Sequence, residues 1–199
     1  MQFESYLQKS TSFPEYMQLL ESLMEQGKTT GADQSELMVS YARLNLQRMR
    51  RVDKTTQLLP ELEAVLAQIR QPQTWIVLTE GWCGDAAQIL PLFHLIAAKY
   101  PVITLRILLR DENTELMDQY LTNGGRAIPK LIITDAATHA ELGNWGPRPA
   151  AATELLNDLK AIGADLEVMK EKLHLWYAKD KTVHIQQELI TLLKGELPL

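Results

Sequence analysis

The sequence is poor in cysteine, has no long apolar run and carries no excess of positive charge. Cys83 is the single cysteine of 199 residues, so no intrachain disulfide and no multi-cysteine zinc site can form. Lysine and arginine number 20 against 25 aspartates and glutamates, and this net charge of −5 disfavours nucleic acid as the main partner. No stretch approaches 18 apolar residues and the first residues do not resemble a signal peptide, so we expect no membrane span and a reducing, cytoplasmic location.

Residues 1–71 are predicted to form a helical N-terminal region packed on the core. Apolar side chains recur at helical spacing from Phe13 to Leu23, and Asp33 followed by Glu36 resembles a capping box at the start of a second helix. A third helix is predicted over 56–69. The second helix ends in a cluster of cations, namely Arg48, Arg50, Arg51 and Lys54. The cluster has two interpretations, which are complementation of the helix dipole and a site for an anionic partner.

Residues 72–163 have the pattern of an α/β domain. Short apolar runs over 74–79 and 102–109 predict buried strands, separated by a helix over 84–99. A helix over 111–121, strands over 130–134 and 139–144, and a helix from Pro149 to Gly163 complete the order. This order predicts an α/β sandwich that contains a βαβ unit. Residues 164–199 are predicted to be a C-terminal helical extension with a break near 180–182.

Cys83 lies between a predicted strand and a predicted helix. Unpaired N–H groups and the helix dipole stabilise a thiolate at such a position, whereas a lone cysteine can equally be a small buried hydrophobe. The negative charge of Asp85 opposes ionisation, and Arg126 would offset it if the two lie close together, so the direction of the pKa shift stays open. His94 is about 16 Å away along the helix axis and cannot act as a base for this thiol. Trp145, Trp176 and Tyr177 are interpreted as packing residues, and His139, His174 and His184 as solvated or packed.

The segment Trp82-Cys83-Gly84-Asp85 resembles the Trp-Cys-Gly-Pro-Cys motif of the thioredoxin family. Ile128-Pro129 before a predicted strand, and Gly146 after the last strand, are placed as in that family. The resemblance covers 72–162. It implies a thioredoxin-like three-layer α/β fold with helical N-terminal and C-terminal extensions.

The resemblance also implies roles for individual residues. Cys83 corresponds to the attacking cysteine, and Pro129 to a cis-proline beside it. The backbone of Ile128 would pair with an extended substrate segment, which is a form of strand addition. The substrate-binding residues implied are Trp82, Gly84, Asp85, Ile128 and Pro129.

Two departures from the family pattern affect the chemistry. Ala86 stands where the family has its second, resolving cysteine, so the ordinary dithiol mechanism is excluded. Val77 stands where the family has a buried aspartate that serves proton transfer.

Two functions follow from the resemblance and the departures. The first is a monothiol redox protein in which Cys83 forms a mixed disulfide or an oxidised species, and an external thiol such as glutathione resolves it. Arg50 and Arg126 would then hold the carboxylates of that small thiol, and no bound cofactor or metal is expected. The second is a catalytically degenerate module that binds a protein or peptide, with the helical extensions offering a surface for a homodimer. An exposed, reactive Cys83 favours the first function and a buried, inert one favours the second.

Overall fold

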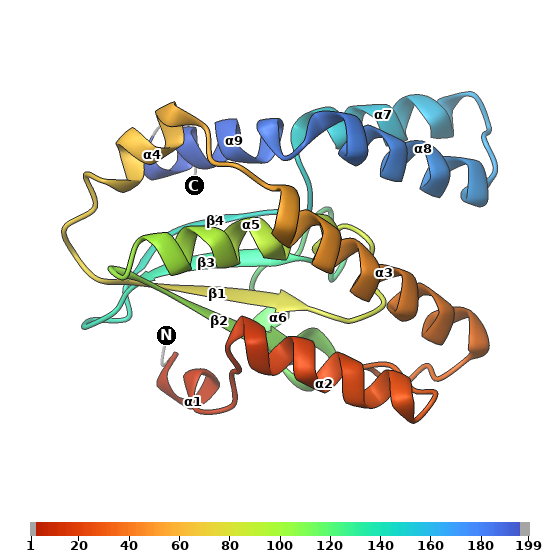
Figure 1. Cartoon of the computed structure of the whole chain (residues 1–199), viewed down its shortest axis with the longest axis horizontal. Helices are drawn as coiled ribbons and strands as arrows, with labels where there is room; N and C mark the ends of the chain where they lie inside the picture. The colour runs from red at the N-terminus through yellow and green to blue at the C-terminus, as the bar shows by residue number, and fades with distance from the viewer. Residues whose placement is uncertain (1–2, 196–199) are drawn as a thin grey trace.

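The computed structural model describes residues 3–195 and contains a four-stranded mixed sheet with helices packed around it (Figure 1). Strand β1 (Gln73–Thr79) pairs in parallel with β2 (Ile103–Leu109) and antiparallel with β3 (Lys130–Asp135), which pairs antiparallel with β4 (Glu141–Trp145). The order β2-β1-β3-β4 places β1 and β3 in the centre. Both central strands are almost completely buried, which explains why they are continuous apolar runs in the sequence. The α/β fold predicted from the sequence is confirmed.

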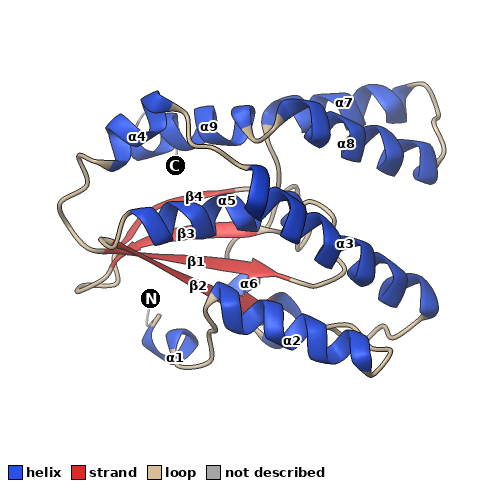
Figure 2. Ribbon diagram, in the orientation of Figure 1, coloured by secondary structure: helices blue, strands red, loops and turns tan. Residues whose placement is uncertain are grey.

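The first three N-terminal helices lie beside β2 or along the helix that follows β1, whereas the fourth lies beside a helix of the C-terminal region (Figure 2). They are α1 (Glu4–Leu7), α2 (Phe13–Glu25), α3 (Glu36–Thr55) and α4 (Pro60–Leu66). Helix α2 packs on β2 and on α3, and α3 packs along α5 (Ala86–Lys99). A complete capping box at Ser12 and Glu15 begins α2. The loop between β1 and α5, which carries Cys83, therefore lies next to the N-terminal helices.

In the described part of the chain, β4 is followed by α7 (Ala150–Ala161), α8 (Leu166–Asp180) and α9 (Val183–Leu193). Helix α7 packs on α8, whereas α9 packs on β4 and on α4. The side chain of Gln186 joins α9 to the N-terminal region, because it accepts from Leu59 N at 2.7 Å and donates to Gln57 O at 3.0 Å. Residues from both terminal regions share one hydrophobic cluster with the sheet. Within residues 3–195 no helix is long and apolar enough to cross a bilayer.

Three predicted helices have different bounds in the structure. The helix expected from Asp33 begins at Glu36, with the hydroxyl of Ser35 accepting from Met38 N. The helix expected over 56–69 is reduced to α4, because a proline is tolerated only in the first turn and Pro60 opens it. The helix expected over 111–121 is a 3₁₀ turn (Arg110–Glu112) and a short α6 (Thr114–Met117). Between them the Asn113 side chain donates to Leu109 O and so competes with a continuous helix.

Candidate functional site

The Cys83 thiol lies in the loop between β1 and α5 and is almost completely buried, with 7% of the residue exposed. Its Sγ donates to the carbonyl of Ile128 at 3.3 Å and accepts from Ala86 N at 3.5 Å. The cysteine N–H donates to Glu80 O at 3.1 Å, which closes a tight turn before α5. The sulfur therefore sits between the start of α5 and the segment that precedes β3.

The carboxylate of Asp85 connects this loop to the C-terminal region. Arg148, in the segment after β4, donates to Asp85 Oδ2 through Nη2 at 2.6 Å and Nε at 3.2 Å. Tyr177 on α8 donates its hydroxyl proton to Asp85 Oδ1 at 2.7 Å. Asp85 is only 6% exposed, so these charge-assisted bonds replace the water that a buried carboxylate needs. We call these three residues the Asp85 clamp.

The surroundings of the thiol hold it in its protonated form. Burial, and after it the charge of Asp85, raise the pKa of Cys83 to about 12. The backbone N–H groups of Ala86 and Asp85 and the charge of Arg148 act in the opposite direction and are outweighed. The pKa shift of Cys83, whose direction the sequence left open, is therefore an increase.

Helix α8 lies directly on the motif at Gly84. A methyl group at this glycine would lie 2.8 Å from Cε1 and 3.0 Å from Nε2 of His174. Burial, and after it the charge of Arg48, lower the pKa of His174 to about 4, so the ring is neutral at neutral pH. A neutral ring and a tyrosine hydroxyl therefore cover the Gly84–Asp85 side of the thiol.

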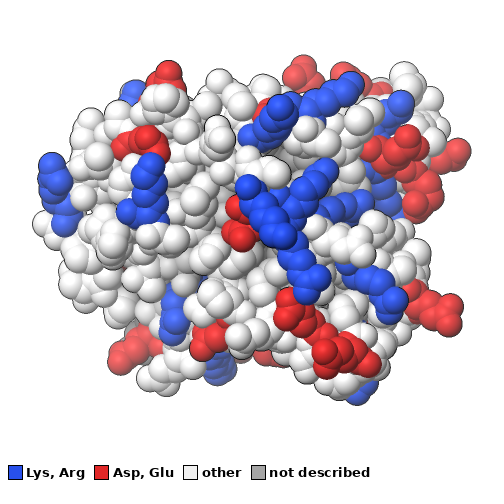
Figure 3. All heavy atoms as spheres, viewed as in Figure 1, with Lys and Arg blue, Asp and Glu red and all other residues white. Residues whose placement is uncertain are grey.

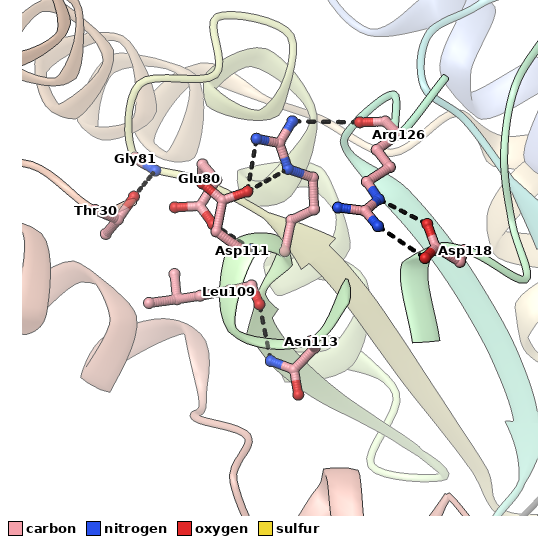
Figure 4. A network of polar contacts seen from close by, with 9 residues as sticks. Thr30, Glu80, Gly81, Leu109, Asp111, Asn113, Asp118 and Arg126 are labelled. Atoms are coloured by element: carbon pink, nitrogen blue, oxygen red, sulfur yellow. Dashed lines mark hydrogen bonds and ion pairs between the residues drawn. The ribbon is translucent and has the colours of Figure 1, made fainter. Parts of the chain in front are cut away.

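The N-terminal region holds the other end of the loop, at Gly81. The N–H of Gly81 donates to Thr30 Oγ1 at 2.8 Å, and Asn45 on α3 donates to Gly81 O at 3.1 Å. Figure 4 shows the Thr30–Gly81 contact beside Glu80, whose Oε1 accepts from Asp111 N at 2.9 Å. Glu80 is 1% exposed, and burial raises its pKa. The loop that carries Cys83 is thus fixed by both helical extensions.

Trp82 is half-buried, and charged side chains that form ion pairs lie beside it. The guanidinium of Arg110 lies over its ring at 4.8 Å, in cation–π geometry, and donates to the carbonyl of Arg126 at 3.3 Å. The Arg126 side chain turns away to Asp118 in a bidentate pair at 2.6 and 2.7 Å (Figure 4). The sequence suggested that Arg126 offsets the negative charge of Asp85. In the structure Arg126 pairs with Asp118, and Arg148 offsets the charge of Asp85.

The segment before β3 completes the site. The Ile128–Pro129 and Gly146–Pro147 peptide bonds are both cis. Gly146 has a φ of 115°, and a methyl group there would lie 2.3 Å from Pro129 O, so only glycine fits between these two segments.

This arrangement agrees with a comparison against protein families. A family model described as thioredoxin matches residues 31–160, which include Cys83, Pro129 and Gly146. The chain belongs to the thioredoxin family. No curated protein matches it.

Two solved structures share the thioredoxin-family fold of this chain. One is a protein of unknown function from Pseudomonas aeruginosa, with a TM-score of 0.59 and 18% identity over 94% of this chain and 99% of that one. The other is an HIV epitope scaffold, with a TM-score of 0.58 and 18% identity over 93% of this chain and 99% of that one. At this level of identity the likeness concerns the fold alone.

The residues that the family resemblance named lie together around the thiol. They are Trp82, Gly84, Asp85, Ile128 and Pro129. Sequence reasoning missed three further residues, because Tyr177 and His174 were interpreted as packing or solvated and Arg148 was not considered. The spacing of three between His174 and Tyr177 puts them on one face of a helix, but nothing in the sequence shows that this face meets Asp85. Arg50, considered for anion binding, pairs with Glu21 at 2.7 Å.

Proposed function

We propose that this thioredoxin-family protein binds a protein or peptide partner and that Cys83 is not a reactive nucleophile in the free protein. The closed position of the thiol under the Asp85 clamp carries this proposal. The thiolate is the reactive form of cysteine, and a pKa of about 12 leaves about one thiol in 10⁴ ionised near pH 8. The absence of a resolving cysteine at Ala86 and of a buried acid at Val77 supports the same function.

The surface proposed for the partner is the face of Trp82 and the neighbouring segment 126–128. Trp82 and Ala127 are half-buried and Arg126 is exposed, whereas Ile128 is buried, so part of the indole and the backbone at 126–127 border solvent beside the covered thiol. An extended segment of a partner chain fits this combination, because it can pair with backbone while its side chains contact the indole. The partner is therefore proposed to be a protein or peptide.

Alkylation of Cys83 by iodoacetamide tests whether the thiol is closed. With a native pKa of about 12 and an unfolded pKa of about 8.5, the native protein should react about 10³ times more slowly than the urea-unfolded chain near pH 8. Intact mass gives the extent of modification, and Cys83→Ser is the blank. A native reaction as fast as the unfolded one, with an apparent pKa below about 8.5, would overturn the proposal.

The monothiol redox function is the second candidate, and one observation favours it. Ala86 N, at the start of α5, donates to Sγ, as a donor that stabilises a thiolate would. In this function the Cys83 thiolate attacks a partner disulfide and releases one partner thiolate. The thiolate of an external thiol such as glutathione then attacks the partner sulfur of the mixed disulfide, which releases the Cys83 thiolate and leaves the partner joined to glutathione by a new disulfide bond. Incubation with glutathione disulfide separates the candidates, because only an accessible thiol accumulates a glutathione adduct that reductant removes.

A further inference from the structure

A cavity of about 340 Å³ opens where the carboxyl end of α3 meets the side of α5 and the junction of α8 and α9. It borders the Asp85 clamp through Tyr177, but neither of the residues that hydrogen-bond the thiol lines it. None of the described residues that line it is acidic. Its polar lining is Arg51, Thr55, Thr56, Gln88, Lys181 and Thr182.

Two buried side chains in this lining have unused hydrogen-bond donors. Gln88 is 3% exposed; its Oε1 accepts a weak 3.5 Å bond from Arg51, and its amide N–H groups have no partner in the described part of the chain. Thr182 is 6% exposed, and its Oγ1 accepts from Gln186 Nε2 at 3.0 Å, which leaves the hydroxyl proton free to donate. Because both side chains line the cavity, these donors are available there to a ligand that accepts hydrogen bonds.

Two cations stand at the mouth of the same cavity. Arg51 and Lys181 are exposed, and neither lies within ion-pair distance of an acidic group in residues 3–195. Figure 3 shows basic side chains gathered in the middle of this face, over the carboxyl half of α3 and the junction of α8 and α9. The carboxylate of Asp180, just before Lys181, is turned inward and pairs with His184. In a chain with a net charge of −5, this is a local excess of positive charge.

The carboxyl end of α3 would repel an anion, because the last carbonyl groups of a helix carry partial negative charge. Near this end, two carbonyl groups accept hydrogen bonds from side-chain hydroxyls in addition to backbone bonds. The hydroxyl of Thr55 donates to Arg51 O at 3.0 Å, and that of Thr56 donates to Val52 O at 2.8 Å. The positive charges of Arg51 and Lys181 must therefore outweigh the repulsion that remains.

We propose that this cavity binds a phosphate-type dianion, either inorganic phosphate or the phosphate group of a small phosphomonoester. A guanidinium fork pairs with two phosphate oxygens, and an ammonium group with neutral donors serves the others. The cavity is within the size range of small-molecule sites, so it also has room for a small organic group. The site is separate from the partner surface at Trp82, and its occupancy is measured without reference to Cys83 reactivity.

Isothermal titration calorimetry of the full chain with sodium phosphate, in a phosphate-free buffer at fixed ionic strength, tests the proposal. We expect one saturable site, which Arg51→Gln and Lys181→Gln each weaken about tenfold or more. Arg50→Gln is the matched control, because it removes the same charge from the same helix, from a side chain paired with Glu21. Its affinity should stay within about twofold of the wild type.

Two further titrations identify the ligand. Glycerol phosphate binding more tightly than phosphate assigns the site to phosphomonoesters, and the reverse order assigns it to free phosphate. Succinate tests the charge alone, because it is a dianion without the tetrahedral oxygens. The proposal is overturned if phosphate shows no saturation below about 10 mM, if Arg50→Gln weakens binding as much as Arg51→Gln, or if succinate binds as tightly as phosphate.

Discussion

Replacing Gly84 by alanine should separate helix α8 from the motif that carries the thiol. The added methyl group would lie 2.8 Å from Cε1 of His174, closer than atoms in ordinary contact. Gly84 does not have a positive φ, so the backbone accepts alanine and the effect comes from the contact alone. Overpacking of this kind costs about 1–3 kcal/mol, and a domain of this size loses about 2–4 °C in Tm per kcal/mol. We therefore expect Gly84→Ala to lower Tm by about 2–12 °C.

A double-mutant cycle measures whether His174 is the cause. Differential scanning calorimetry of the wild type, Gly84→Ala, His174→Ala and the double variant should show that removal of the ring abolishes the effect of the methyl group. Alkylation of Cys83 should be faster in Gly84→Ala than in the wild type, and should return toward the wild-type rate if the double variant repacks. An unchanged Tm in Gly84→Ala, or an additive double variant, would refute the packing of α8 on the motif.

Three further predictions concern the same region. Because burial raises the folded pKa of Cys83 to about 12, the protonated thiol contributes stability that is complete below about pH 8.5 and is lost as pH rises. In urea titrations the free energy of unfolding of the wild type should therefore fall relative to that of Cys83→Ala between about pH 8.5 and 11. Parallel curves for the two proteins would count against the raised pKa. Tyr177→Phe removes a donor to a buried carboxylate and should lower the free energy of unfolding in urea by about 1.5–3 kcal/mol. The control Tyr41→Phe, at an exposed contact, should change it by no more than about 0.5 kcal/mol. Equal effects would show that burial of the acceptor is irrelevant. Gly146→Ala places a methyl group 2.3 Å from Pro129 O at a φ of 115° and should cost about 2–6 kcal/mol by the same assay, so a near-neutral variant would contradict this contact.

The sheet and the placement of the cysteine could be predicted because they depend on local patterns. A run such as Gln73–Thr79 is apolar on both faces, and a motif between a strand and a helix is fixed by chain continuity. The short α6 was missed because it depends on one side chain, Asn113, that competes for a backbone carbonyl. The spacing of apolar residues along the chain gives no information about such a hydrogen bond.

The electrostatics of the candidate site could not be predicted from the sequence. The pKa of Cys83 depends on burial and on a carboxylate that meets Tyr177 across 92 residues of chain. Sequence spacing placed Arg126 near enough to be considered as the partner of Asp85, whereas the fold gives that role to Arg148. Contacts between distant segments are set by packing of whole elements, which residue patterns do not encode individually.

The contact between α4 and α9 has a consequence for the synthesis of the chain. Gln186 binds the backbone at Leu59, 127 residues earlier, and Leu62 and Leu66 of α4 are buried in a core that α9 helps to complete. At about 5–20 residues per second, a ribosome needs about 6–25 s to make the intervening segment. During that interval the apolar side of α4 lacks the cover that α9 provides, and nascent chains should bind a holdase chaperone more than the completed chain does until residues 183–193 have emerged.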